Sequence, residues 1–229
     1  MSKKGEEITD CNYQAPIFNA LTKSEMSLLD SHRIEVRYQP GEIIFKQGSP
    51  CSHVVSFDEG QAMEYVEGAN KARIILRLIK PPEFISGTGI FSDMKHQFSL
   101  KAIVPSSACF IEFGSIKELI LKNQAFVQAY LKNIDNSLKY SYYKLSSLTS
   151  KYQLGRLSET LLYLANDFYE TNPFELTISK PDLGGMSNMS KESVYRLLNE
   201  LEKDGIIKIE GNLFTIFKPQ RLAEISRNS

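Results

Sequence analysis

The sequence predicts an α+β protein with an N-terminal double-stranded β-helix (a jelly roll), then a long helix, then a C-terminal winged helix-turn-helix. Three observations support this prediction. Short apolar runs separated by glycines fill 34–113, a heptad pattern fills 123–152, and a strand, two short helices and a hairpin follow residue 170. This order favours two packed regions joined by one helix.

The composition is that of a globular chain. Of the 229 residues, 42% are hydrophobic and 24% are charged, which is ordinary for a soluble protein and allows two modest domains. The first residues, MSKKGEEITD, lack the apolar core of a signal peptide, and no apolar run is long enough to span a bilayer. We therefore expect a cytoplasmic protein with no membrane partner.

The three cysteines predict no disulfide framework, because they are odd in number and far apart in the sequence. We expect Cys109, in ACFIEF, to be a buried strand residue, and Cys11 and Cys51 to be incidental. A redox role for Cys51, in a turn after Pro50, stays open.

The region 34–113 is expected to be β-structure, because alternating apolar residues and glycine turns are typical of a β-barrel or jelly roll. The glycines that punctuate and follow it are Gly41, Gly48, Gly60, Gly68, Gly87, Gly89 and Gly114.

The region 123–151 contains no glycine or proline, and its apolar residues alternate steps of four and three, which predicts the seam of a parallel homodimeric coiled coil. The seam residues are Val127, Leu131, Ile134, Leu138, Leu145 and Leu148. Ser141 interrupts the seam, either to fix its register or to touch a ligand. The alternative is one amphipathic helix packed on its own domain. A second helix is expected over 154–170, with Gly155 at a hinge.

The region 180–205 has the pattern of a helix-turn-helix. Breaker residues at Gly184-Gly185 and Ser187-Asn188 end a helix that begins near Lys180, and Ser190 is a good N-cap for the next helix. On that helix, apolar residues recur at helical spacing: Val194, Leu197, Leu198 and Leu201. Two β-type runs joined by Gly211-Asn212 predict a hairpin, and 174–178 predicts a further strand.

The polar face of this second helix suits a DNA major groove. Arginine pairs with O6 and N7 of guanine, and glutamate accepts from N4 of cytosine. The alternative is an amphipathic surface helix with solvated charges. The overall charge does not support DNA binding through a general positive field, since 151–229 holds ten Lys/Arg against eleven Asp/Glu in a chain of net charge zero. DNA binding would depend on locally placed cations: Lys180, Lys191, Arg196, Lys208 and Lys218.

Three motifs resemble the Crp/Fnr family of bacterial transcription regulators. Tyr38–Gly48, with Gly60 twelve residues later, is similar to the opening of the cyclic-nucleotide-binding β-roll. Ser190-Lys191-Glu192-Ser193-Val194 followed by Arg196 resembles the family's recognition helix, and Gly155-Arg156 resembles the start of its fourth helix. The resemblance covers about residues 15–220.

The resemblance implies the domain organisation and the DNA contacts. It implies a flexible N-terminus (1–14), an effector-sensing β-roll (15–122), a dimerisation helix (123–152) and a DNA-binding winged helix-turn-helix (153–229). Glu192 and Arg196 match the residues that read inner G·C pairs, and Lys191 stands where the cyclic-AMP receptor protein has an arginine. The expected DNA contacts are Lys180, Lys191, Glu192, Ser193, Tyr195 and Arg196.

The resemblance also bears on the effector. Cyclic-AMP-binding members hold the ribose and phosphate with a Gly-Glu pair and an Arg-Ser pair, where this chain has Gly87-Thr88 and Phe98-Ser99. Since carboxylate and guanidinium are both missing, cyclic AMP is disfavoured. An apolar effector or a collapsed pocket is expected instead, and the pocket residues are Phe84, Ile85, Gly87, Thr88, Phe98, Ser99, Ser141 and Tyr142.

No metal or other cofactor is predicted. Three unclustered cysteines disfavour an iron–sulfur cluster, whereas haem stays open with His32, His53 and His96 as single candidate ligands. No nucleophile–base set, metal-spaced cluster or phosphate loop suggests an enzyme.

The sequence therefore predicts a homodimeric, non-enzymatic regulator that binds double-stranded DNA at a two-fold palindromic site, controlled by an unidentified effector. RNA polymerase is a partner if the protein activates. The alternatives are a ligand-sensing or interaction module that has lost DNA binding, and a regulator of haem, gas or redox state.

Overall fold

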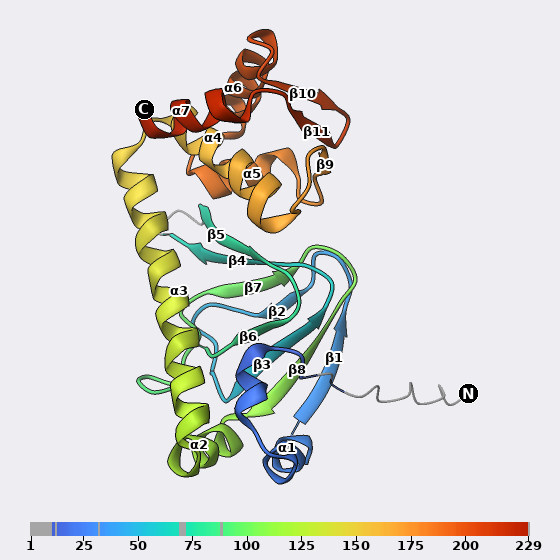
Figure 1. Cartoon of the computed structure of the whole chain (residues 1–229), viewed down its shortest axis with the longest axis vertical. Coiled ribbons are helices and arrows are strands. Elements are labelled where there is room, and N and C mark those ends of the chain that lie inside the picture. Colours follow the sequence, from blue (N-terminus) through green and yellow to red (C-terminus); the bar gives the residue numbers. More distant parts are fainter. Residues whose placement is uncertain (1–10, 12, 32, 69–71, 88, 229) are drawn as a thin grey trace, which may run out of the picture. The chain divides into compact units, whose positions relative to one another are not determined.

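The computed structural model describes residues 11, 13–31, 33–68, 72–87 and 89–228. The chain divides into two compact units: unit 1 comprises 1–62 and 80–137, and unit 2 comprises 63–79 and 138–229. Figure 1 labels the elements of both units. None of the described helices is long and apolar enough to cross a membrane.

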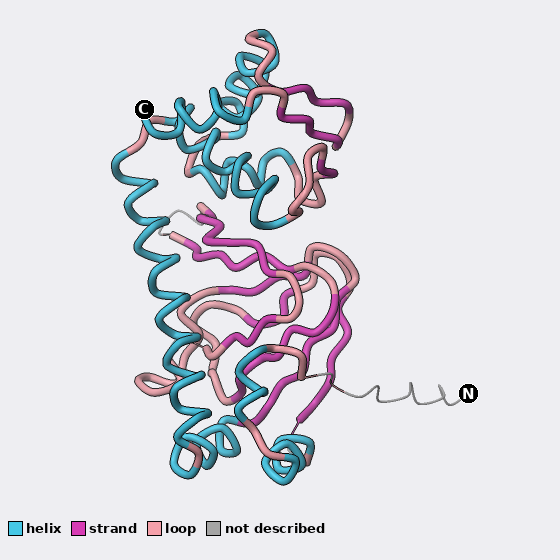
Figure 2. Tube along the Cα trace, viewed as in Figure 1, coloured by secondary structure: helices cyan, strands magenta, loops and turns pink. Residues whose placement is uncertain are grey.

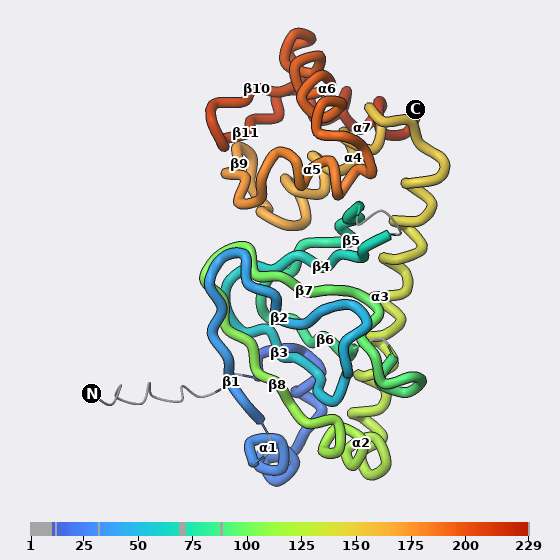
Figure 3. The backbone as a smooth tube through the Cα atoms, turned by 180° about the vertical axis from the view of Figure 1, so that it is seen from behind, coloured from blue at the N-terminus to red at the C-terminus, as the bar shows by residue number. Residues whose placement is uncertain are grey.

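Unit 1 is built around an antiparallel sheet. Its strands, in spatial order, are β1 (Arg33–Tyr38), β8 (Ser106–Glu112), β3 (His53–Glu59) and β6 (Glu83–Ile85). Figure 3 shows β1, β8 and β3 side by side. The central strands β3 and β8 are buried over most of their length, as expected for strands with a neighbouring strand on each side.

A second four-stranded sheet completes the β-structure. It consists of β2 (Ile43–Phe45), β7 (Ser99–Ala102), β4 (Ala62–Glu67) and β5 (Arg73–Ile79). The first two strands lie in unit 1 and pair antiparallel, and the last two belong essentially to unit 2. Two four-stranded sheets confirm the predicted jelly roll.

Short helices cover one side of the first sheet. They are η1 (Pro16–Ala20), α1 (Lys23–Asp30) and α2 (Phe113–Lys122). Helix α1 begins with a capping box, in which Thr22 accepts from the Glu25 backbone N–H and Glu25 accepts from that of Thr22. Their apolar residues form one buried cluster with β8 and the start of the long helix.

The cysteine prediction is wrong in one respect, because Cys11 and Cys109 form a disulfide with a Cα–Cα distance of 6.2 Å. Cys109 is indeed a buried strand residue of β8, but Cys11 is its partner and not incidental. Their sequence separation of 98 residues hides the pairing, since only the fold brings the N-terminal segment to β8. Cys51 is a buried free thiol.

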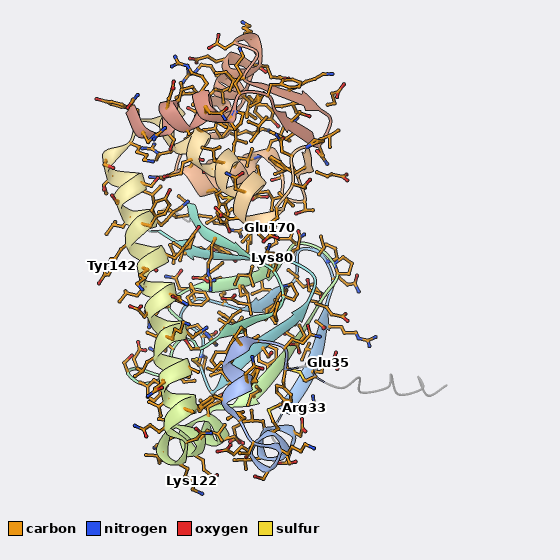
Figure 4. All side chains as sticks on the ribbon, in the orientation of Figure 1. Arg33, Glu35, Lys80, Lys122, Tyr142 and Glu170 are labelled. Carbon is orange, nitrogen blue, oxygen red and sulfur yellow. A yellow bond between two sulfur atoms is a disulfide. The ribbon has the colours of Figure 1, made fainter. Side chains whose placement is uncertain are left out.

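The long helix α3 spans Gln124–Ser150 without a break, which confirms the helix predicted over 123–152. In unit 1 it buries Phe126 and Tyr130. Several seam residues lie on its exposed side, with Leu131 59% and Leu145 60% exposed. Figure 4 shows the side chain of Tyr142 pointing away from the helix. Apolar residues that recur along an exposed stripe are typical of a helix that meets a partner.

Unit 2 contains the winged helix-turn-helix, with its helices in cyan and its hairpin in magenta in Figure 2. Its elements after α3 are α4 (Gln153–Tyr163), the π-helix η2 (Leu164–Phe168), β9 (Phe174–Glu175), α5 (Lys180–Ser187), α6 (Lys191–Lys203), β10 (Ile207–Glu210), β11 (Leu213–Ile216) and α7 (Pro219–Asn228). Strands β10, β11 and β9 form one antiparallel sheet, and Gly211-Asn212 closes the predicted two-residue hairpin.

Three local predictions about unit 2 need correction. The strand expected over 174–178 is only two residues long, and the helix expected over 154–170 changes to a π-helix at Leu164. Gly155 lies buried inside α4, and the break between the two helices falls at Lys151-Tyr152. Sequence periodicity does not resolve such boundaries to the residue.

The two units also divide the chain differently from the expected domain boundaries, because unit 2 includes 63–79. Helix α5 packs on β5, and a Cβ added at Gly185 would lie 3.0 Å from Ile75 Cδ1. This contact joins segments far apart in the sequence.

Candidate nucleic-acid interface

Both helices of the helix-turn-helix begin with a side-chain cap. At the start of α5, Ser179 accepts from the Asp182 backbone N–H, and Asp182 accepts from that of Ser179, in a capping box. At the start of α6, Ser190 Oγ accepts from the Ser193 backbone N–H at 3.2 Å. The predicted cap at Ser190 is therefore confirmed, and it fixes where the helix begins.

The turn between the helices is tightly held. Asn188 ends α5 in the left-handed region with φ of 48°, which asparagine tolerates well. A Cβ added at Gly184 would lie 2.7 Å from the Met189 carbonyl oxygen, so the close approach of α5 to the turn requires glycine here.

Arg156 of α4 fixes the same turn from outside. Its Nε donates to the Ser187 carbonyl oxygen at 2.7 Å, and its Nη2 donates to that of Asn188 at 3.2 Å. Thr160 shares a hydrogen bond of 2.9 Å with the Ser187 hydroxyl. The sequence singled out Arg156 only as part of a family motif. Its role depends on two carbonyls about thirty residues later, which no local pattern reveals.

Helix α6 has one buried and one exposed face. Val194, Leu197, Leu198 and Leu201 are buried, as predicted from their spacing. Lys191, Glu192, Tyr195 and Arg196 are exposed, and Ser193 is half-buried. Five of the six predicted DNA contacts therefore lie along the first turns of one helix.

The exposed side chains of α6 interact only weakly with one another. Arg196 Nη1 lies 3.7 Å from Glu200 Oε2, and both side chains are largely exposed, so the pair adds little stability and can separate at small cost. The ammonium of Lys191 lies 5.8 Å from the centre of the Tyr195 ring. Hydrogen bonds from its own backbone N–H and from Ser190 lower the pKa of Glu192, which keeps it an ionised acceptor.

The other predicted cations lie around this helix. Lys180, the sixth predicted contact, is half-buried at the first position of α5. On the wing, Lys208 forms an ion pair with Glu210 at 2.8 Å, and Lys218 donates to the Asp204 carbonyl oxygen at 2.9 Å. The wing lysines therefore have partners within their own domain.

The predicted effector residues of unit 1 fall into two aromatic clusters. The ring of Phe84 packs edge-on against Phe18 and Tyr130, whereas the ring of Phe98 packs against Phe45, with centroids 5.3 Å apart. Ile85 is buried in β6, and Gly87 has φ of 66° next to the Cys51 sulfur. Ser141 and Tyr142 are exposed residues of unit 2, and Thr88 lies outside the described residues.

The side chains near Phe98 do not fit a cyclic nucleotide. Phe98 is only 6% exposed and offers no group for a phosphate. Ser99 Oγ is buried and accepts from the Gln47 backbone N–H at 2.9 Å. The ring of His96 stacks on Phe45 at 4.0 Å, and burial lowers the pKa of His96, which favours a neutral ring. The described side chains of Phe45, His96 and Phe98 therefore form a packed aromatic cluster.

The two candidate haem ligands that the structure describes already have other partners. His53 Nδ1 shares a hydrogen bond of 2.9 Å with the Ser52 hydroxyl, His96 is buried against Phe45, and His32 lies outside the described residues. Within the described part of the chain, Cys11, Asp58 and Cys109 are the only group with ligand-like spacing. Its two sulfurs form the disulfide and are not thiolates, the form that binds metals.

Two family profiles match the chain. Residues 35–123 match the cyclic nucleotide-binding domain, and residues 155–225 match the Crp-like helix-turn-helix domain. Together they include most of unit 1 and the whole helix-turn-helix.

Regulators are among the similar proteins. The "Anaerobic regulatory protein" of Pasteurella multocida (strain Pm70) is 24% identical over 225 residues, which cover 95% of this chain and 81% of the relative. The "Fumarate and nitrate reduction regulatory protein" of Yersinia pestis is 23% identical over 227 residues, covering 96% and 90%.

Solved structures share the fold. FixK2 from Bradyrhizobium japonicum has a TM-score of 0.75 at 20% identity, covering 84% of this chain and 96% of its own. A mutant of CooA from Carboxydothermus hydrogenoformans also has a TM-score of 0.75, at 18% identity, covering 96% and 98%. At such identities the likeness shows the order of β-roll, long helix and winged helix-turn-helix.

Proposed function

The chain belongs to the Crp/Fnr family of transcription regulators, a family that is not enzymatic, and we propose that it binds DNA sequence-specifically as a homodimer. The observation that carries the proposal is the exposed polar face at the start of α6, on a helix held at its cap, its turn and its buried face. A rigid helix with free polar side chains suits major-groove readout.

The proposed base contacts centre on Glu192 and Arg196. The guanidinium of Arg196 is free to form two hydrogen bonds with one guanine, and the Glu192 carboxylate accepts from cytosine. Lys191 offers a point charge, which cannot bind guanine with two parallel hydrogen bonds as arginine does. Tyr195, on the same exposed face, offers a ring to a thymine methyl group. Ser193 and Lys180 are proposed as contacts near the phosphates.

The proposed dimer forms along the seam of α3. Two copies of α6 would then meet successive major-groove faces of a palindromic double-stranded site about one turn apart. The proposal includes the domain boundaries of 15–122, 123–152 and 153–229, a bacterial cytoplasmic location, and RNA polymerase as a partner of an activator. Control by an unidentified effector remains part of the proposal.

The DNA-binding proposal is tested by selecting binding sites from random DNA with the wild-type chain and with Arg196→Ala. We expect the variant to lose preference at one symmetric G·C pair, at a cost of about 1–3 kcal/mol per contact. The affinity of the wild type should fall with salt, because phosphate contacts release counterions.

Arg221→Ala is the matched control, because Arg221 is also an exposed helical arginine paired with a glutamate, Glu224, at 3.0 Å. It should leave the selected sequence unchanged. An unchanged site for Arg196→Ala, or binding with no salt dependence, would overturn the assignment of this helix.

The dimer proposal is tested by Leu145→Asp, which places a charge in the exposed apolar seam. We expect sedimentation to show a monomer where the wild type is a dimer, because a carboxylate in a closed apolar interface lacks a partner. Ser146→Asp, on the neighbouring exposed position of α3, should remain dimeric. A dimer that persists in Leu145→Asp removes the seam as the interface.

A further inference from the structure

Unit 2 contains a half-open cavity of about 430 Å³ that has no part in the DNA-binding proposal. It is lined by Tyr140, Tyr143, Lys144, Glu159, Thr160, Leu162, Tyr163, Asn166, Asp167, Met186 and Ser226. Its volume is within the range of small-molecule sites, which combine apolar walls with a few placed polar groups. The residues come from the second half of α3, from α4 and η2, and from α5 and α7.

Aromatic side chains form much of the wall. The rings of Tyr140 and Tyr163 lie with centroids 6.3 Å apart. The Tyr140 hydroxyl donates to the Leu76 carbonyl oxygen at 3.0 Å, and the Tyr163 hydroxyl donates to that of Leu78 at 3.3 Å. Because β5 already satisfies both hydroxyls, these residues offer the cavity mainly ring surface. Such walls favour a flat, apolar ligand.

Lys144 brings a cation to this wall. Its side chain is half-buried, and its ammonium donates to the Met186 carbonyl oxygen. Burial lowers the pKa of Lys144 to about 8, and the nearby charge of Glu159 opposes that shift. Among the residues that the structure describes, no carboxylate forms an ion pair with it. A buried ammonium with only a neutral partner is destabilised and gains from an incoming anion.

Glu159, whose charge acts on Lys144, already has partners of its own. Glu159 forms an ion pair with Lys151 at 2.6 Å and accepts hydrogen bonds from the hydroxyls of Tyr143 and Ser147. Although burial raises the pKa of Glu159, these hydrogen bonds lower it overall, so it stays an anion paired to Lys151. Asp167 is exposed, where water screens its charge. Lys144 is therefore the cation left for a ligand.

We propose that this cavity binds a one- or two-ring aromatic carboxylate, with the carboxylate on Lys144 Nζ and the ring against Tyr140 and Tyr163. Met186 belongs to α5, the first helix of the helix-turn-helix. A ligand that draws the ammonium from the Met186 carbonyl therefore changes a contact that holds α5. The inference that this ligand affects DNA binding rests on the function proposed above. The inference that the cavity binds an aromatic carboxylate does not.

The test is calorimetric titration of the full-length protein, without DNA, using 2-naphthoate and its neutral amide, 2-naphthamide. We expect the acid to bind roughly 10- to 100-fold more tightly than the amide, because only the acid forms a charge-assisted hydrogen bond with Lys144. Lys144→Met should remove this preference while the amide affinity stays within a few-fold of wild type.

Two further variants separate the cavity from general effects. Asn166→Trp, at an exposed lining residue, should weaken both compounds by partly filling the cavity. Lys132→Met, at an exposed lysine of α3 outside it, should change neither.

Several results would overturn the proposal. The proposal fails if 2-naphthoate does not bind at millimolar concentration or if the acid and the amide bind equally well. It also fails if a folded Lys144→Met variant keeps the preference for the acid. Because no DNA is present, a failure of the DNA-binding proposal would leave the binding results as they stand, and the two failures are distinguishable.

Discussion

The recognition helix α6 and the start of strand β7 differ in what they leave available for a ligand. Both contain positions to which the family resemblance assigns ligand contacts. On α6, Lys191, Glu192 and Arg196 are exposed and weakly paired. At β7, Phe98 and Ser99 are buried and already engaged with Phe45 and Gln47.

The difference follows from the geometry of the two elements. An amphipathic surface helix buries one stripe and leaves the rest of its surface free, so recognition residues on α6 change without disturbing the core. A residue inside a closed β-roll has neighbours on every side, so Phe98, at a position where the resemblance expects a polar anchor, packs into the core. The side chains at the start of α6 remain accessible, whereas Phe98 and Ser99 do not.

Phe98→Ala has the largest expected effect on stability. It tests whether Phe98 belongs to the core of the β-roll. If Phe98 is core, its removal should lower the free energy of unfolding by about 3–5 kcal/mol, measured by urea denaturation. Phe91→Ala is the matched control, because Phe91 is 60% exposed in the same unit and should cost much less. Equal losses from the two variants would mean that the aromatic cluster is loosely packed and able to admit a ligand.

Lys144→Met tests an intermediate case, a charge buried near the helix-turn-helix. The pKa of Lys144 is about 8 in the folded protein against 10.5 in the unfolded chain. Below pH 8 Lys144 is protonated in both the folded and the unfolded states, and the folded state carries the full free-energy cost of burying the ammonium. Between pH 8 and 10.5 the unfolded state binds more protons, so the stability of the wild type rises with pH.

The variant should lack this rise. Its stability relative to wild type should therefore be greater at pH 7 than at pH 9.5, by about 1–2 kcal/mol, as measured by urea denaturation at both values. Lys132→Met should show no such change with pH. If the difference in stability between Lys144→Met and the wild type did not change with pH, the Lys144 ammonium would be exposed to water in the folded protein.

Arg196→Ala has the smallest expected effect on stability. It tests whether the exposed polar residues of α6 are dispensable for folding. Because the Arg196–Glu200 pair is exposed, the free energy of unfolding should change by less than about 0.5 kcal/mol, whereas we expect the proposed base discrimination to be lost. Thermal unfolding monitored by circular dichroism would measure this. A large loss of stability would show that α6 depends on Arg196 for its own structure, and the contrast with Phe98 would disappear.

The sequence predicted the elements whose signals are local. The cap at Ser190, the buried stripe of α6, the hairpin at Gly211-Asn212 and the length of α3 each depend on residues within a few positions of one another. The family resemblance placed the candidate DNA contacts on α6, and the structure shows most of them exposed there.

The features that sequence reasoning missed depend on distant partners. The Cys11–Cys109 disulfide, the hydrogen bonds of Arg156 to the turn after α5, and the packing of α5 on β5 all join segments far apart in the chain. The cavity around Lys144 is another example, because five separate elements build its wall.

The sequence by itself therefore determined the order of the elements and which face of α6 is exposed, because helical periodicity and capping act over a few residues. Only the tertiary structure decided that Phe98 is core, that Cys11 has a partner and that Lys144 lies beside a cavity. Burial, and with it the charge a group keeps, is set by neighbours that the fold brings together.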